Sequence, residues 1–256
     1  MKNQQLNYCI YATLLDAFWG YLNSDVVWEK YWGWSENPPH TAEQFHELQF
    51  QELIDRINRK PFDSEKADRG TCFNELVDAL IEHRKPKDVE VERVADDKNA
   101  VWYRAIYNNR TFSFPVSLCC EFADYFKGAL TQIRVEAILP TAYGNVLVYG
   151  LIDELMPTTV HDIKTTGSYT VGKFKDHHQH LVYPYALMQN GSDVRTFEYN
   201  IVEFNKGGYV VDTYTETYVF NPERDIPILT NHCEDFIRFL EENRELITDT
   251  KIFGLE

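Results

Sequence analysis

The sequence predicts a mixed α/β (α+β) domain with a helical addition at its N-terminal end, and three observations support this class. Apolar residues recur at helical spacing through much of residues 8–60. After Lys87 the hydrophobic pattern changes to a period of two, which is typical of strands. Helical spacing returns from Pro222 to about Leu246. Strands are therefore expected in the middle of the chain, with helices before, between and after them.

The N-terminal part, residues 1–68, is predicted to be helical. In TAEQFHELQFQELIDRINRK the apolar residues lie at helical spacing, and Thr41 is the expected N-cap. A further helix is predicted over RGTCFNELVDALIEHRKPK, where Pro86 stops it. The apolar face of this helix consists of Phe73, Leu76, Val77, Leu80 and Ile81.

Alternating segments follow Lys87. VEVERV, AVWYRAIY and RTFSFPV are separated by DDKN and NNR, and they predict an antiparallel meander inserted at residues 88–117. A short helix is expected over SLCCEFADYFKGAL. TQIRVEAIL, NVLVYGLIDEL and TVHDIKTT then predict three successive strands, the first two joined around Tyr143-Gly144-Asn145.

The last part of the chain combines a helix, a hairpin and a second helix. The first helix is expected at residues 174–190. RTFEYNIVEF and GYVVDTYTETYVF alternate as a hairpin around Lys206-Gly207-Gly208, before the final amphipathic helix. We therefore expect one domain, 1–256, made of an N-terminal helical part (1–68), a central core (69–190) and a C-terminal hairpin and helix (191–256).

Composition limits the classes of function. The net charge of −15 opposes attraction of nucleic acid to the whole surface, so any such contact must be local. No apolar stretch is long enough to span a bilayer, and the N-terminus lacks the pattern of a secretory signal, so we expect a cytoplasmic protein without a membrane partner. The five cysteines are scattered without a C-x-x-C pair, which favours reduced thiols over disulfides or a zinc ribbon.

Charged residues interrupt the apolar, β-branched run at residues 146–169. Residues two apart in a strand face the same side, so Asp162 and Lys164 project together. Asp153 joins them if the preceding strand pairs antiparallel across the MPTT turn. Two adjacent carboxylates raise each other's pKa unless a cation neutralises them, and Mg²⁺ or Mn²⁺ accepts such oxygen ligands. The alternative is that Asp153 ends a strand and the other two form a surface ion pair.

Four segments in order resemble the PD-(D/E)XK nucleases, and most closely their RecB-like exonuclease branch. They are R-G-T-C-F-N-E-L-V-D (69–78), G-L-I-D (150–153), D-I-K-T-T (162–166) and Q-H-L-V-Y-P-Y-A-L (179–187). The resemblance implies a restriction-endonuclease-like fold, in which helices flank a mixed central sheet. It also implies a metal-dependent nuclease.

The resemblance assigns roles to particular residues. It implies that Mg²⁺ or Mn²⁺ is held by Asp153, Asp162 and the main-chain carbonyl of Ile163. Lys164 is expected to assist the attacking water. Gln179 and Tyr183 lie one helical turn apart, and the resemblance implies that they face the site and hold the nucleic-acid backbone.

The first segment departs from the family pattern. Asn74 replaces the usual histidine, and the acid that follows is the shorter Asp78. Asn74 can still offer an amide oxygen to a metal. Glu75 or Glu136 is expected to supply a further carboxylate, although an exposed strand glutamate explains Glu136 equally well.

Other residues allow weaker hypotheses. His177 and His180 are candidates for a metal pair, against the alternative of a solvated helix end beside His178. The aromatic stretch FWGYLNSDVVWEKYWGW offers rings for base stacking or for a core. A local electropositive track is a further hypothesis, made of Arg56, Arg59, Lys60, Arg84, Lys85, Lys87, Lys173 and Lys175.

Two cofactors are not expected. Cys233 is the one cysteine beyond Tyr183, so the three late cysteines that hold an iron–sulfur cluster in some RecB-like nucleases are missing. No G-x-x-x-x-G-K-[ST] loop is present, so a built-in ATP motor is not indicated.

The main expectation is a metal-dependent deoxyribonuclease, an exonuclease that acts in DNA recombination, repair or phage DNA processing. DNA is the expected substrate, and the candidate partners are a separate helicase or recombinase, or further copies of the chain in a homo-oligomeric ring. The alternative is a nuclease-like fold that no longer cuts and instead binds DNA or protein. Polarity, strand preference and the choice between DNA and RNA stay open.

Overall fold

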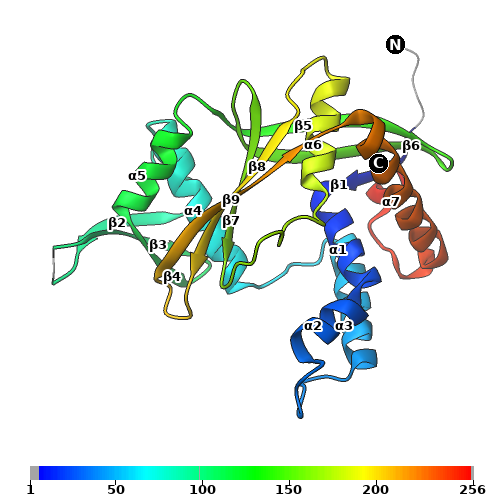
Figure 1. Cartoon of the computed structure of the whole chain (residues 1–256), viewed down its shortest axis with the longest axis horizontal. Coiled ribbons are helices and arrows are strands. Elements are labelled where there is room, and N and C mark those ends of the chain that lie inside the picture. Colours follow the sequence, from blue (N-terminus) through cyan, green and yellow to red (C-terminus); the bar gives the residue numbers. More distant parts are fainter. Residues whose placement is uncertain (1–5, 98, 255–256) are drawn as a thin grey trace.

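The computed structural model describes residues 6–97 and 99–254 and contains two sheets (Figure 1). The larger sheet has the order β1-β6-β7-β8-β9, and β5 pairs with β6 outside this order. Its strands are β1 (Leu6–Tyr11), β5 (Leu130–Thr141), β6 (Gly144–Leu155), β7 (Thr159–Thr166), β8 (Thr196–Phe204) and β9 (Val210–Val219). β1 is parallel to β6 and β7 is parallel to β8, whereas the other pairs are antiparallel, so the sheet is mixed.

The smaller sheet is antiparallel, with the order β2-β3-β4. It consists of β2 (Glu90–Ala95), β3 (Val101–Tyr107) and β4 (Arg110–Pro115). Ribbons of this sheet and of α5 lie at one end of the molecule, and α2 and α3 project from another part (Figure 1). This sheet confirms the meander predicted at residues 88–117.

Helices lie between and around the strands. They are α1 (Ala12–Leu22), α2 (Ser24–Trp32), α3 (Ala42–Ile57), α4 (Glu65–Ile81), α5 (Val116–Tyr125), α6 (Gln179–Gln189) and α7 (Pro222–Glu242), followed by short 3-10 turns at Arg244–Leu246 and Thr250–Phe253. Thr41 caps α3 in a capping box with Gln44, as its position in the sequence predicted. Among the described residues, no helix combines the length and the apolar character needed to cross a membrane.

Two hydrophobic cores cover the two faces of the larger sheet. On β8, Tyr199 and Ile201 pack in the core that contains α1, α6 and α7. Val202 and Phe204, which follow Ile201 on the opposite face of the strand, pack in the other core, with α4, α5 and the small sheet. This alternation follows from the period of two along a strand. The mixed α/β class is therefore confirmed, with helices on both faces.

One element was predicted wrongly. Residues 8–11 belong to β1, although the N-terminal part of the chain was predicted to be helical. The segment NYCIY is an almost continuous apolar run, and a short run of this kind does not distinguish a strand from a helix. In the structure the buried Tyr8 and Ile10 alternate with the half-buried Cys9 and Tyr11, as in a strand. Cys9 lies opposite Leu147 and Ile10 opposite Val148. The helix expected at 174–190 also begins later, at Gln179.

Candidate active site

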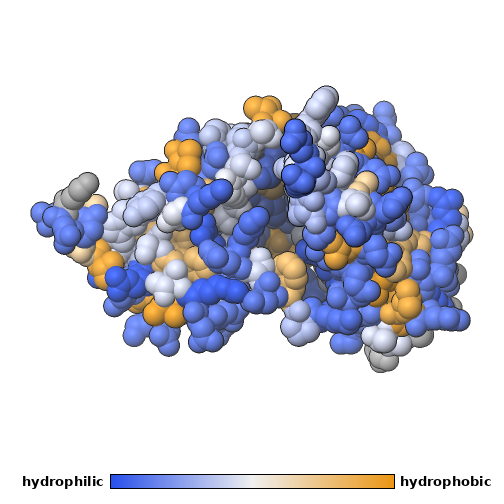
Figure 2. All heavy atoms as spheres, turned by 90° about the horizontal axis from the view of Figure 1, so that it is seen from below, coloured by the Kyte–Doolittle hydropathy of each residue, from blue (hydrophilic) through white to orange (hydrophobic). Residues whose placement is uncertain are grey.

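A cleft of about 600 Å³ opens where α4, β6, β7 and α6 meet. Its lining includes Asn74, Gly150, Asp153, Asp162, Ile163, Lys164, Gln179 and Tyr183. These residues come from all four segments that resemble the RecB-like nucleases. A view of one face shows a mostly hydrophilic surface that is recessed near the middle, between the small-sheet end and the helical end (Figure 2).

The cleft lies where two strands separate. β6 and β7 pair at Glu154 with His161 and at Leu155 with Val160, and no pair follows in the direction of Asp153. The Asp153 carboxylate occupies this fork. Its Oδ2 accepts the main-chain N–H of Ile163 at 2.9 Å. The antiparallel arrangement expected for these strands therefore brings Asp153 to the beginning of the Asp162 segment.

Lys164 is held from two sides. Its Nζ lies 2.7 Å from Oδ2 of Asp162. It also donates a hydrogen bond of 2.7 Å to Oε1 of Gln179. Gln179 in turn donates from Nε2 to Asp162, and Nε2 lies 3.2 Å from the hydroxyl of Tyr183. A lysine, a carboxylate and an amide thus form a closed ring of contacts, which fixes the direction of the ammonium group.

Gly150 makes room for Tyr183. A Cβ at position 150 would lie 2.3 Å from Cε1 of Tyr183 and 2.9 Å from its hydroxyl oxygen. Any larger residue there would displace the ring from the cleft. The glycine that precedes the first aspartate by three positions is therefore needed for packing against α6.

Burial shapes the charges of the cleft. Burial, together with the charge of Asp162, raises the pKa of Asp153 above its ordinary value. Burial alone would lower the pKa of Lys164, but the Asp162 carboxylate and its hydrogen bond outweigh this and raise the pKa. A nearby cation would therefore stabilise the charged form of Asp153, and Lys164 stays charged at neutral pH.

The donor set fits a hard cation. Oδ1 of Asn74 is buried and has no hydrogen-bond partner among the described residues, while its Nδ2 donates to Asp153 at 3.1 Å. An orphaned amide oxygen beside two carboxylates is a ligand set that Mg²⁺ or Mn²⁺ accepts. Within the same residues, no three His, Cys, Asp or Glu side chains group closely enough to hold an ion by themselves. An amide or main-chain oxygen would therefore have to complete such a site.

Two predicted carboxylates lie elsewhere. Glu75 is bound by the guanidinium of Arg84 and by the main-chain N–H of Lys87. It follows Asn74 by one position, and this rotates it by about 100° around the helix, away from the cleft. The exposed Glu136 accepts hydrogen bonds of 2.9 and 3.0 Å from Arg134. Neither side chain lines the cleft.

A second pair of acids is buried behind the cleft. Glu154 is fully buried, and burial raises its pKa well above the ordinary value. Burial also raises the pKa of Asp78 to about 6, although Gln132 donates to its carboxylate at 3.0 Å. Asp78, the acid of the first of the four segments, is thus buried and does not line the cleft.

The histidines near the start of α6 contact other elements of the fold and so do not form a solvated helix end, while a metal pair of His177 and His180 stays a prediction. His178 is buried, and its Nδ1 lies 3.1 Å from Asp16. Its ring stacks on His232 of α7 at 4.0 Å, with an angle of 7° between the planes. His180 stacks on Tyr218 at 4.4 Å. These contacts join the α6 region to α1, α7 and β9, and no local pattern in the sequence indicates this because the elements meet only in the fold.

The sequence did not predict part of the rim. Tyr11, Ala12 and Thr13 line the cleft because β1 lies beside β6. Arg134 also lines it and lies 5.3 Å from the ring of Tyr149. These contributions depend on the missed strand and on the pairing of β5 with β6. A basic residue on a strand next to the motif strand is the signal that would have suggested Arg134.

The proposed basic track is only partly at the cleft. Arg59 lines the cleft, where it pairs with Asp249 and donates to the Tyr149 hydroxyl at 3.1 Å. Arg84 is neutralised by two glutamates. The remaining lysines and arginines of the predicted track do not line this cleft. In the aromatic stretch, Phe18 is buried in the core, as one of the two alternatives predicts, while Trp34 is 94% exposed. Base stacking stays a prediction.

Comparisons with known proteins show no family for this chain. No protein-family model matches the chain, and no curated protein matches it. A solved structure described as "Crystal structure of SSO0001" is similar, with a TM-score of 0.39 and 13% identity. The similarity covers 93% of this chain and 78% of that one.

Proposed function

We propose that the protein is a metal-dependent deoxyribonuclease of the RecB-like exonuclease type, which hydrolyses phosphodiester bonds in DNA. One observation carries the proposal. Asp153, Asp162 and Lys164 line one cleft, and Asp162 and Lys164 are in direct contact there. This supports an active site over the alternative of an exposed surface ion pair, because Asp162 is 2% exposed.

The residues for a metal ion are Asp153, Asp162, the main-chain carbonyl of Ile163 and the orphaned Oδ1 of Asn74. A bound Mg²⁺ or Mn²⁺ supplies charge neutralisation for a phosphate and a lowered pKa for water. No iron–sulfur cluster and no ATP are part of the proposal.

The protein's own groups contribute a fixed positive charge and a shaped surface. The Lys164 ammonium is oriented by Asp162 and Gln179, so it can stabilise negative charge that develops on the phosphate without reorganising. It can also orient an attacking water through its remaining N–H. Gln179 and Tyr183 fix the α6 side of the cleft. Arg59 and Arg134 lie on the rim, where a phosphate backbone would have to compete with their partners Asp249 and Glu136.

The direct test is degradation of linear DNA by the purified protein. Activity is expected with Mg²⁺ or Mn²⁺ and is expected to stop in EDTA. Lys164→Ala should abolish it, whereas Lys127→Ala, at an exposed position after α5, should retain it. Equal activity of Lys164→Ala and the wild type would contradict the mechanism. Partners of the enzyme would include a separate helicase or recombinase, or further copies of the chain in a ring around DNA.

A second candidate is a nuclease-like fold that binds DNA or protein without cutting. It is favoured by Asn74, which replaces the family histidine and whose Nδ2 is bound to Asp153. Calorimetry with Mn²⁺ separates the two candidates. Heat that disappears in Asp153→Asn supports the nuclease, and the absence of any metal binding supports the binding module.

A further inference from the structure

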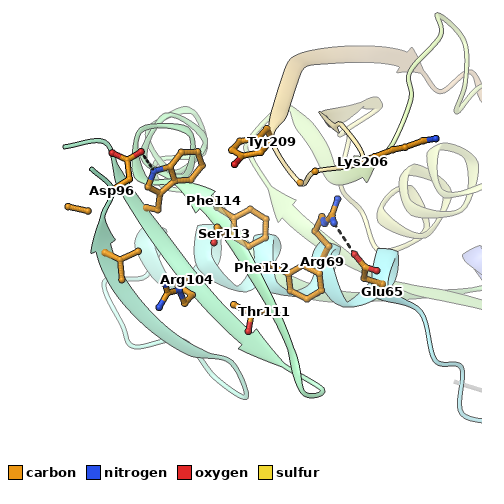
Figure 3. Close-up of a pocket in the computed structure, with 15 residues that line it drawn as sticks. Glu65, Arg69, Asp96, Arg104, Thr111, Phe112, Ser113, Phe114, Lys206 and Tyr209 are labelled. Carbon is orange, nitrogen blue, oxygen red and sulfur yellow. Dashed lines mark hydrogen bonds and ion pairs between the residues drawn. The ribbon is translucent and has the colours of Figure 1, made fainter. Parts of the chain in front are cut away.

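A second hollow lies apart from the cleft. Its volume is about 520 Å³, and it lies between the small sheet, the first turns of α4 and the turn that joins β8 to β9 (Figure 3). We call it the aromatic groove, and its lining includes Glu65, Arg69, Asp96, Trp102, Arg104, Phe112, Phe114, Lys206 and Tyr209. None of these residues lines the cleft.

Aromatic rings form one side of the groove. Trp102 and Tyr209 meet edge to face, with ring centres 6.3 Å apart and an angle of 81° between the planes. The indole N–H of Trp102 donates to Asp96 at 3.3 Å, which fixes the direction of the ring. Tyr209 is 62% exposed. An exposed ring that borders a hollow offers a free face for a flat ligand.

Cationic side chains line the groove from α4, from β3 and from the β8–β9 turn. Arg69 lies over the rings of Phe112 and Phe204, at 5.6 and 5.4 Å, and pairs with Glu65 at 3.1 Å. Arg104 pairs with Glu92 at 2.6 Å. Lys206 has no hydrogen-bond or ion-pair partner within residues 6–97 and 99–254, and its side chain extends from the β8–β9 turn away from Tyr209 (Figure 3).

The cationic groups of the groove differ in their pairing. Arg69 is paired with Glu65 and Arg104 with Glu92, so these two arginines add no excess of positive charge. Lys206 has no such partner within the part of the chain that the structure describes, so it adds a free ammonium group at the edge of the groove. A free ammonium group beside exposed rings is complementary to a ligand that is both flat and anionic.

We infer that the aromatic groove binds a nucleotide unit, with the base against Tyr209 and Trp102 and the phosphate near Arg69, Arg104 or Lys206. A free nucleotide and one unit of a single strand share this chemistry. The inference does not depend on the proposed nuclease activity. Helix α4 nevertheless links the two places, because Arg69 and Asn74 are five residues apart, about 7.5 Å along the helix axis.

The test observes the groove itself. Of the five tryptophans, four lie before residue 35, and Trp102 is the fifth. Its indole N–H resonance can be assigned in ¹⁵N-labelled full-length protein by its loss in Trp102→Phe. Titration with dT10 or with thymidine monophosphate in EDTA, where no hydrolysis occurs, should shift this resonance at saturation. A resonance that stays unmoved by both probes overturns the inference.

Variants test the two halves of the groove. Tyr209→Ala should weaken the binding seen at Trp102 about tenfold or more, since base stacking on one ring carries that much. Tyr143→Ala, at an exposed tyrosine in the β5–β6 turn, is the matched control and should not change it. Arg104→Ala combined with Lys206→Ala should lower the slope of log affinity against log salt by about 0.7 for each phosphate that the two side chains neutralise in the wild type. Equal affinities of Tyr209→Ala and Tyr143→Ala would overturn the inference.

Two further readouts define the ligand and separate the groove from the cleft. Similar affinities for thymidine monophosphate and dT10 identify a site for a free nucleotide, and much tighter binding of dT10 identifies a site for a strand; both support the inference. Hydrolysis of bis(p-nitrophenyl) phosphate with Mn²⁺ reports the cleft alone and should be unchanged in Tyr209→Ala. Loss of that hydrolysis in Lys164→Ala, or its absence in every variant, concerns the proposed nuclease and leaves the result at Trp102 unaffected.

Discussion

The cleft and the aromatic groove share helix α4 but hold their charges in different ways. In the cleft, Asp162 is 2% exposed, and Lys164 is bound by Asp162 and Gln179. In the groove, Tyr209 is 62% exposed and Lys206 has no partner among the described residues. The same chain therefore contains one set of charges that is fixed and buried and another that is exposed and adjustable.

This difference separates two kinds of task. Burying charges is unfavourable unless they are paired, and the chain accepts this only where position matters. Fixed dipoles and charges stabilise a transition state because they need no reorganisation during the reaction. Exposed rings and long cationic side chains adapt to a ligand and bind it with less specificity. This difference agrees with the two proposals, chemistry in the cleft and binding in the groove.

The largest expected effect is on catalysis in the cleft. Asp162→Asn removes the charge that orients Lys164, and it should reduce hydrolysis of bis(p-nitrophenyl) phosphate by about a hundredfold or more. Tyr209→Ala should leave the rate unchanged. Circular dichroism of both variants shows whether the fold is retained. A folded Asp162→Asn protein with the wild-type rate would remove the distinction between the two regions.

Acid should destabilise the protein through the histidines behind the cleft. Burial lowers the pKa of His232 from 6.5 in the unfolded chain to about 4. Between these values the unfolded state binds the proton and the folded state does not, so stability is lost as the pH falls from 6.5 to 4. His232→Gln should remove up to about 3 kcal/mol of this loss. Urea unfolding at pH 7 and pH 4.5 measures it, and an identical pH dependence in both proteins would refute the prediction.

Gly150 offers a test of the packing that positions Tyr183. Gly150→Ala should destabilise the fold by about 1–3 kcal/mol, because the new Cβ overlaps the tyrosine ring. Gly20→Ala is the matched control, since a Cβ at Gly20 in helix α1 meets nothing within 4 Å. It should be neutral or stabilising. Chemical unfolding of both variants gives the comparison, and equal effects would show that Tyr183 is not held by this contact.

The smallest effect is expected from the groove. Lys206→Ala and Tyr209→Ala change exposed side chains, so the free energy of unfolding should stay within about 0.5 kcal/mol of the wild type. Urea unfolding checks this. A loss of several kcal/mol would mean that these side chains support the fold. Their exposure would then no longer argue for a binding role.

The sequence predicted most elements and the central cluster of the cleft. Alternation revealed the meander and the strands that carry Asp153 and Asp162, because these patterns depend on local periodicity. It did not reveal β1, because Tyr8, Cys9, Ile10 and Tyr11 form a short apolar run without alternation, and such a run can equally belong to a helix. The expected antiparallel pairing of β6 with β7 is present, although it ends at Glu154 and His161.

The remaining errors and omissions come from long-range packing. Glu75 was considered a ligand from its place beside Asn74, but a neighbour on a helix points in another direction, and Arg84 binds it. The aromatic groove was not predicted because Trp102 and Tyr209 are more than a hundred residues apart. Two segments of such separation can be brought together only by the completed fold.

A crystal soaked in Mn²⁺ tests the central claim most directly, because the anomalous signal locates the ion independently of activity. We expect one strong anomalous peak in the cleft, in contact with carboxylate oxygens of both Asp153 and Asp162. The peak should disappear in Asp153→Asn and persist in Tyr209→Ala. A cleft without a peak at saturating Mn²⁺, while the two aspartates keep their positions, would contradict the account.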